Sequence, residues 1–357
     1  MARPLLVLLL AALLLGCAGR QLRERPYNDA ALPARTKIFL VAGGVEVANF
    51  AAEVIAQRRL WLARGLAPDE IACYWARPGA AELRADRRQY RRLAAELRDC
   101  YPASAAVLRA HLQQQATRSL PYLYLYITSH GDADILPEHV PEDSLLPSER
   151  DLFDQYVIQL GAGVGRGVLP GPLALAMRRG ADPDDLVLSP RLLRDLLHRF
   201  PASTPKLVVL QACHSGGFIA DARPERRADA ITDVPGLTAI ASARFDRTSF
   251  GCGEMDHYTF FDDCFLRALP MAGDFPGLGG LVQQCVAERE AQIGDVAAGL
   301  RPLVDPHQEL RPEAVGRLLE DLPGRRGHWR LARVHQPGRQ FPQDALPRPL
   351  YEVRTRP

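Results

Sequence analysis

The chain has 357 residues, of which 47% are hydrophobic and 24% are charged. This is the composition of a globular protein, and it excludes a disordered, collagen-like or polytopic membrane protein. The formal net charge of +2 gives no global field to attract nucleic acid, so we expect no nucleic-acid partner. The length allows two domains or one large α/β domain.

The first 16 residues are typical of an export signal. Arg3 precedes an unbroken apolar run from Leu5 to Leu15. A helix of that length rises only about 16 Å, too short to cross a membrane. Residues 14–17, Leu-Leu-Gly-Cys, resemble the lipobox of bacterial lipoproteins. The resemblance implies cleavage before Cys17 and acylation of Cys17. The alternative is an ordinary signal peptide with an incidental cysteine.

The predicted anchor sets the expected location of the protein. Several acyl chains hold a protein stably on a membrane, whereas one does not. Ala18 follows Cys17, and the absence of Asp there resembles the sorting pattern of outer-membrane lipoproteins. Residues 17–35 are polar and read as a tether. We therefore expect an exported protein, lipid-anchored to the cell envelope on the periplasmic face of the outer membrane.

Apolar runs and amphipathic segments alternate through the body of the chain. The runs predict strands at Lys37–Ala42, Ile71–Trp75, Tyr122–Ile127, Leu207–Leu210 and Leu237–Ala241. The amphipathic segments predict helices at Ala48–Leu62, Leu83–Leu97, Ala105–Gln115, Leu192–Phe200, Thr259–Leu269 and Leu281–Gln292. This alternation favours an α/β fold with a mostly parallel central sheet and helices on both faces.

Two segments depart from this rhythm. Residues 132–190 are rich in Asp, Glu, Pro and Gly and predict weak helices at most. A long insert between two core strands is usually functional or mobile. Residues 301–357 are rich in Pro and Arg, and we predict no fold for them. The predicted domain therefore spans residues 36–300, with the insert inside it.

Reactive side chains follow two of the predicted strands. The strand ending at Ile127 leads into Ser129-His130-Gly131, and the strand ending at Leu210 leads into Ala212 and Cys213. In open α/β sheets ligands bind beyond the carboxyl ends of the strands, so distant residues can meet there. A cysteine nucleophile needs a base, most often histidine, to take its proton and protonate the leaving group.

Three stretches, each near a strand end, resemble the caspase–legumain clan of cysteine peptidases, and within it the legumain family. They are Ser129-His130-Gly131, Ala212-Cys213-x-Ser215-Gly216, and Val47-Ala48-Asn49-Phe50 after the first strand. The likeness extends over roughly residues 37–268 without the insert. It implies the caspase-like three-layer sandwich fold.

The resemblance also implies roles for individual residues. Cys213 would be the nucleophile, His130 the general base and acid, and Asn49 the residue that orients His130. The amides of Gly131 and Cys213 would form the oxyanion hole. The implied reaction is peptide-bond hydrolysis through a thioester, with a peptide or protein substrate, no cofactor and no metal.

The predicted substrate pocket departs from the legumain pattern. Ala51 and Ala52 replace a basic residue and a histidine, and Gln211 replaces an acidic residue two positions before the nucleophile. These departures put the preference for Asn in doubt. By position, the pocket would contain Gln211, Ser242, Arg244 and Asp256.

Other interpretations of single residues stay open. His130 and Cys213 could be ordinary core residues, and Asn49 could be a helix N-cap. His214 is interpreted as a neighbour of the nucleophile rather than a second base. Beyond Cys17 and Cys213, five cysteines allow at most two bridges, and Cys252 with Cys264 is one possible pair.

The sequence therefore predicts a lipid-anchored cysteine endopeptidase. A transpeptidase or transamidase would use the same His130–Cys213 dyad and differ only in which nucleophile meets the acyl-enzyme. A catalytically silent binding lipoprotein of the envelope is the alternative from another class.

Overall fold

The computed structural model describes residues 32–83, 85–133, 146–153, 155–161, 170–219, 229–245, 247–249, 257–299 and 351–354. The predicted leader, Cys17, most of the tether, Cys252, Asp256 and most of the segment 301–357 lie outside these residues. Within the described ranges, no helix has both the length and the hydropathy needed to cross a membrane.

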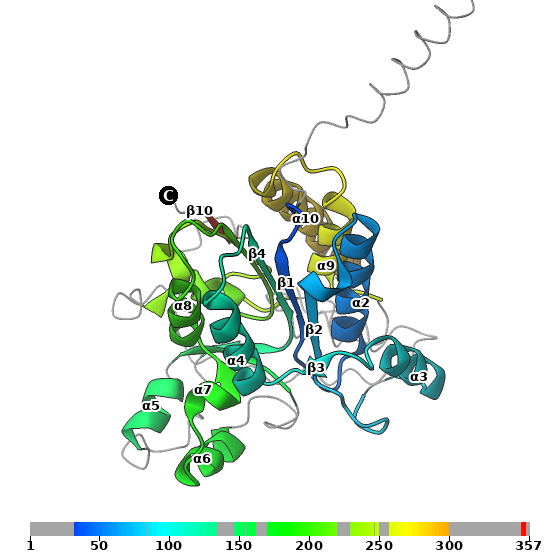
Figure 1. The fold of residues 1–357 in the computed structure, drawn as a ribbon. Helices are drawn as coiled ribbons and strands as arrows, with labels where there is room; N and C mark the ends of the chain where they lie inside the picture. The colour runs from blue at the N-terminus through cyan, green and yellow to red at the C-terminus, as the bar shows by residue number, and fades with distance from the viewer. Residues whose placement is uncertain are drawn as a thin grey trace, which may run out of the picture.

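A seven-stranded sheet forms the centre of the molecule (Figure 1). Its strands are β1 Lys37–Ala42, β2 Ile71–Trp75, β3 Tyr101–Pro102, β4 Leu123–Thr128, β8 Lys206–Gln211, β9 Leu237–Ala241 and β10 Tyr351–Arg354. They lie in the order β10-β9-β8-β4-β1-β2-β3. The six strands from β3 to β9 in this order are parallel, and β10 pairs antiparallel with β9. The predicted mostly parallel sheet is confirmed.

Helices cover both faces of this sheet. One layer contains α2 Ala48–Ala63, α3 Arg87–Glu96, α9 Phe260–Ala268 and α10 Phe275–Gly299, and the other contains α4 Ala105–Ala116 and α8 Pro190–His198 (Figure 1). Along β4, Tyr124 and Tyr126 face the first layer, while Leu125 and Ile127 face the second. Because both faces are buried, the strand reads as a continuous apolar run. The predicted three-layer arrangement is confirmed.

Side-chain caps fix where several helices begin. The side chains of Ser104, Ser189 and Thr259 each accept a hydrogen bond from the amide three residues later, at the starts of α4, α8 and α9. Such caps satisfy amides that have no partner within the helix. By fixing where α4, α8 and α9 begin, they also fix where the loops before these helices end.

The insert is more regular than the sequence predicted. It contributes a three-stranded antiparallel sheet of β5 Gly131–Ala133, β6 Tyr156–Gln159 and β7 Val187–Leu188, with helices α5 Pro147–Phe153, α6 Pro170–Arg178 and α7 Pro183–Leu186. The expectation of weak helices at most is wrong, because strands this short show no readable periodicity. Arg109 of α4 pairs with Asp182 at 2.9 Å and Asp185 at 2.5 Å, which ties the insert to the body.

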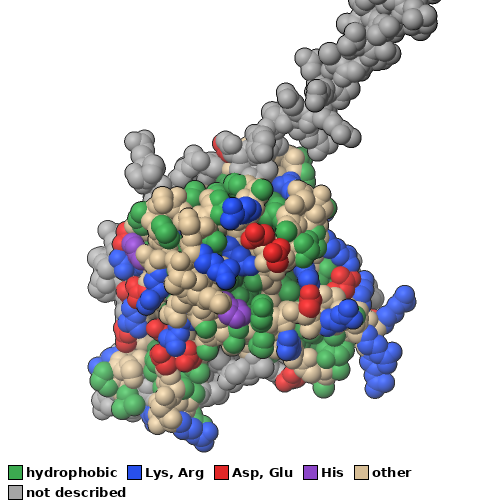
Figure 2. Space-filling model, viewed as in Figure 1, with side chains coloured by type: hydrophobic (Ala, Val, Ile, Leu, Met, Phe, Trp, Pro, Cys, Tyr) green, Lys and Arg blue, Asp and Glu red, His purple; other side chains and the backbone are tan. Residues whose placement is uncertain are grey.

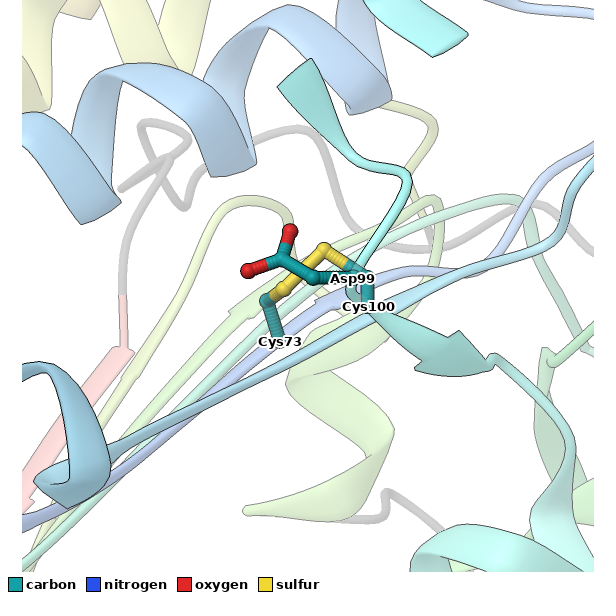
Figure 3. A group of neighbouring side chains, drawn as sticks. All are labelled: Cys73, Asp99 and Cys100. Carbon is teal, nitrogen blue, oxygen red and sulfur yellow. A yellow bond between two sulfur atoms is a disulfide. The ribbon is translucent and has the colours of Figure 1, made fainter. Parts of the chain in front are cut away.

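Two disulfides cross-link the first helical layer and the neighbouring sheet edge. Cys73 of β2 is bonded to Cys100, just before β3 (Figure 3). Cys264 of α9 is bonded to Cys285 of α10. The suggested pairing of Cys264 with Cys252 is wrong, because α9 packs against α10 and brings Cys285 within bonding distance.

Acidic and basic side chains are intermixed over the surface shown in Figure 2, with no continuous patch of one sign. This distribution matches the nearly balanced charge of the chain.

The strand order places a switch point between β1 and β4. From β1 the chain builds outward through β2 and β3, and then returns to build β4, β8 and β9 on the other side. At such a point, neighbouring strands send their following segments in opposite directions and leave a crevice beyond their carboxyl ends. The segments after β1, β4 and β8 meet at this edge.

Candidate active site

The predicted catalytic pair lies beyond the ends of two adjacent strands. β4 and β8 pair in register up to Thr128 and Gln211. The Ser129 amide continues the pairing by donating to the Gln211 carbonyl oxygen at 3.0 Å. His130 and Cys213 each follow two residues after that last pair. Because neighbouring strands are about 4.8 Å apart, the register brings both residues to the same edge.

Gly131 packs directly on the backbone of Cys213. A Cβ atom at this position would lie only 2.1 Å from the Cys213 carbonyl oxygen. No other residue type fits there without a shift of the backbone. The contact shows that the two strand ends touch, while the oxyanion role of the Gly131 amide stays a prediction.

The Cys213 thiol is half-buried and is the free cysteine of the described residues. The Ser249 amide donates a hydrogen bond to its sulfur at 3.4 Å. Burial raises the pKa of the Cys213 thiol, the Ser249 hydrogen bond opposes this rise, and the charge of Asp132 adds to it. The thiol is therefore protonated at neutral pH and needs a base to become a nucleophile.

The turn that carries Cys213 is held against the segment 242–249. The His214 amide donates to the Arg247 carbonyl oxygen, and the Gly216 amide donates to the Ala243 carbonyl oxygen, both at 2.8 Å. The His214 Nδ1 atom lies 2.9 Å from the Phe245 carbonyl oxygen. His214 has a φ of 59°, a left-handed conformation that is unfavourable for a residue with a side chain. These bonds hold the strained turn in place.

Two of the predicted pocket residues support this turn. The Gln211 Oε1 atom accepts from the Thr128 hydroxyl at 2.8 Å, and its Nε2 atom donates to the Ser249 hydroxyl at 3.4 Å. The Ser242 hydroxyl lies 3.1 Å from both the amide nitrogen and the carbonyl oxygen of Ala212. Gln211 therefore links β4 to Ser249, whose amide contacts the sulfur, and Ser242 holds the backbone of Ala212, which precedes Cys213.

The other two predicted pocket residues are Arg244 and Asp256. The Arg244 guanidinium lies over the Phe245 ring, 5.6 Å from its centroid. Asp256 lies outside the described residues. Contact of either residue with substrate stays a prediction.

A pair of buried carboxyl groups, Glu53 and Asp262, lies beneath the site. The Thr128 hydroxyl oxygen is also hydrogen-bonded to one Glu53 carboxyl oxygen, and the Thr259 amide donates to the other at 2.7 Å. The Tyr126 hydroxyl donates to Asp262 at 2.6 Å. Burial raises the pKa of both carboxyls, and the charge of Glu53 raises that of Asp262 further. Burial therefore favours the protonated forms of these two carboxyls.

His130 is enclosed by the loop after β1, by α2 and by the insert. Its ring meets the Phe50 ring edge to face, with centroids 5.2 Å apart. Its Nε2 atom lies 3.2 Å from the Glu46 Oε1 atom. The Gln159 amide of β6 donates to the His130 carbonyl oxygen at 3.0 Å, and the Ser129 hydroxyl donates to the Gln159 carbonyl oxygen at 2.6 Å. The insert thus forms part of the wall of the site.

Asn49 is buried in the first turn of α2. The interpretation of Asn49 as the helix N-cap is wrong, because Val47 occupies that position and its side chain makes no capping bond. A role for Asn49 in orienting His130 stays a prediction.

Sequence reasoning missed three residues that shape the site. Glu46 approaches the His130 ring, Gln159 binds its backbone, and Ser249 contacts the Cys213 sulfur. Glu46 could have been found, since it follows a core strand in the same way as His130 and Cys213. Gln159 carried no signal, because its contact depends on how the insert folds. The stretch that begins at Ser249 resembles a legumain stretch, but its contact with the Cys213 sulfur depends on how the loop after β9 folds.

One group of side chains in the described part of the chain has metal-ligand spacing, namely Cys73, Asp99 and Cys100 (Figure 3). Its two sulfur atoms are bonded to each other, so they are not available as thiolate ligands. The Asp99 carboxylate is hydrogen-bonded to Arg58 at 2.9 Å. We interpret this group as a disulfide beside an ion pair.

No model of a known protein family matches the chain. No curated protein matches its sequence. Among solved structures, caspase-1 from Spodoptera frugiperda is similar with a TM-score of 0.41 and 13% identity, over 74% of this chain and 81% of that one. Protein GSU0716 from Geobacter sulfurreducens is similar with a TM-score of 0.40 and 15% identity, over 72% and 89%. The fold class itself follows from the strand order and layers described above.

Proposed function

We propose that this protein is a cysteine endopeptidase in which Cys213 is the nucleophile and His130 the general base and acid. The observation that carries the proposal is the β4–β8 register, which brings a histidine and a free cysteine to one edge of the sheet. That edge lies at the switch point, where open α/β sheets bind their ligands.

Each proposed step follows from the chemistry of these two side chains. His130 takes the thiol proton, and the sulfur forms a bond to the carbonyl carbon of the scissile peptide. The C–N bond then breaks, and His130 gives the proton to the departing amine. Water, with its proton taken by His130, attacks the thioester and releases the acid and the Cys213 thiol. Amides of Gly131 and Cys213 would stabilise the oxyanion in both halves.

The residue preferred before the cut would be set by the floor of the pocket. Gln211 is fully buried and is bonded through both ends of its carboxamide. Because this carboxamide is buried and both its ends are bonded, we propose that Gln211 acts on the preference indirectly, by fixing Ser249 beside Cys213. A strict legumain-like preference for Asn is then not required.

We also propose that the protein is exported and anchored through Cys17. The two disulfides support export, because such bonds persist in oxidising compartments such as the periplasm. Radiolabelled palmitate should be incorporated by the full chain and not by a Cys17→Ser variant. Equal labelling of both proteins would contradict the anchor.

Peptide cleavage tests the proposed activity directly. Purified wild type and Cys213→Ala would be compared on fluorogenic peptides that vary at the residue before the cut. Cleavage by wild type alone is the expected result. If wild type only transfers the acyl group to added amines, the protein is a transferase that uses the same dyad. No reaction with any peptide or amine would favour a binding lipoprotein.

A further inference from the structure

We propose that Glu46 is a positioning residue that holds His130 in the orientation and tautomer needed to accept the Cys213 proton. This inference rests on the proposed peptidase function. Neither the sequence motifs nor the implied role of Asn49 points to Glu46.

The first observation is the contact itself. Glu46 Oε1 lies 3.2 Å from His130 Nε2, and the two side chains are only 12% and 24% exposed. A carboxylate with so little access to water is unfavourable unless a positive or hydrogen-bonding partner faces it. Among the described residues, His130 Nε2 makes no hydrogen bond of aligned geometry, so the approach is an electrostatic one. Catalytic hydrogen bonds are often misaligned before substrate binds.

The second observation is the orientation of the ring. The His130 Cδ2 atom faces Gly44, at 3.2 Å from where a Cβ would stand. Nε2 and Cδ2 form one edge of an imidazole, so this edge faces the loop after β1, which carries both Gly44 and Glu46. Nδ1 is therefore the nitrogen that would accept the Cys213 proton. A carboxylate at Nε2 keeps the proton there in the neutral ring and leaves the Nδ1 lone pair to act as base.

The third observation is the support behind Glu46. The Gly43 amide donates to the Thr128 carbonyl oxygen, and the Gly161 amide donates to the Gly43 carbonyl oxygen, both at 2.9 Å. The loop is thus tied to β4 on one side and to the end of β6 on the other. A positioning residue needs such a fixed base, because small displacements at a reacting centre are costly.

The charged groups around this pair come from three elements. Glu46 belongs to the loop after β1, Asp132 to β5, and the Cys213 thiol to the turn after β8. The Asp132 charge raises the pKa of the Cys213 thiol, and Glu46 is the carboxylate that faces the His130 ring. Replacement of Glu46 by Gln removes one of these charges and keeps the shape of the side chain.

The test compares wild type, Glu46→Gln and Glu46→Asp, with Glu70→Gln as a matched control at the opposite edge of the sheet. We expect Glu46→Gln to lower kcat about 100-fold with KM changed less than about threefold. The reason is that a His130 ring with its proton on the wrong nitrogen slows the chemical step rather than substrate binding. Glu46→Asp should recover part of the activity, and Glu70→Gln should match wild type. A kcat of Glu46→Gln equal to that of wild type would overturn the proposal.

A second measurement does not depend on turnover. The rate at which iodoacetamide alkylates Cys213 would be followed against pH, with Cys213→Ala as background. In Glu46→Gln the midpoint should move to higher pH by about one pH unit. If wild type cleaves no peptide but this shift occurs, Glu46 acts on His130 and only the peptidase function fails. An unchanged midpoint would reject the role of Glu46 whatever the activity.

Discussion

At the scale of residues, the site depends on close contacts that leave no room for substitution. The clearest is the approach of Gly131 to the Cys213 carbonyl oxygen. It couples the position of His130, one residue earlier in the chain, to that of Cys213. A change at Gly131 therefore alters the geometry of both residues of the proposed dyad.

We predict that Gly131→Ala lowers kcat/KM about 100-fold, because its methyl group forces the ends of β4 and β8 apart. The control is Gly280→Ala in α10, where a Cβ meets no atom within 4 Å. That variant should keep full activity and gain up to about 1 kcal/mol of stability from helix propensity. Wild-type kinetics for Gly131→Ala would contradict the proposed contact.

At the scale of elements, the apolar runs predicted the core well because helices bury both faces of the sheet. The bounds of β1, β2 and β9 agree with the sequence prediction, and β4 and β8 differ by one residue at their ends. Because the apolar runs mark where β4 and β8 end, His130 and Cys213 could be placed just beyond these strand ends from the sequence. Pairing within the insert and the Cys264–Cys285 bond could not be predicted, since both depend on how elements pack.

The Cys73–Cys100 bond joins β2 to the segment before β3 and closes a separation of 27 residues. Loss of a bond that closes a loop of this size costs about 3 kcal/mol, mainly through the unfolded chain. We predict that the free energy of unfolding of the double variant Cys73→Ser with Cys100→Ser, measured by urea denaturation, is lower by that amount. Its activity in the absence of urea should be unchanged, because the bond lies at β2 and β3 whereas His130 and Cys213 follow β4 and β8.

Reduction provides the control for this prediction. Reduced wild type should lose more stability than the double variant, since Cys264–Cys285 is then also broken. A double variant as stable as oxidised wild type would show that this bond adds nothing to the fold.

At the scale of the whole molecule, hydrogen bonds connect the buried carboxyl pair of Glu53 and Asp262 to the candidate site. Glu53 connects through Thr128 to Gln211, which borders the nucleophile turn. Asp262 of α9 is bonded to Tyr126 and Thr259. The ionisation of this pair therefore bears on the free energy of unfolding.

The pKa of Asp262 is raised well above its ordinary value by burial and by Glu53. A carboxyl with a raised pKa binds its proton more tightly in the folded state. Its stabilising contribution is complete below the unfolded pKa of about 3.9 and is lost as pH rises through the folded pKa. The loss approaches about 1.4 kcal/mol per pH unit for one proton.

Asp262→Asn cannot titrate, so its free energy of unfolding should fall less between pH 5 and 8 than that of wild type. Urea unfolding at several pH values measures this difference. Asp195→Asn, at an exposed position of α8, is the control and should follow the wild-type curve. Parallel curves for wild type and Asp262→Asn would show that the pair does not titrate in this range.

The most direct test of the central claim is whether Cys213 forms an acyl-enzyme. A peptide ester would be mixed with the full chain, quenched with acid within milliseconds and examined by intact-mass spectrometry and peptide mapping. We expect a mass increase equal to the acyl group, located on Cys213, that is absent in Cys213→Ala and slow to appear in His130→Gln. Cleavage of a reactive peptide without any adduct on Cys213, or an adduct on another residue, would contradict it.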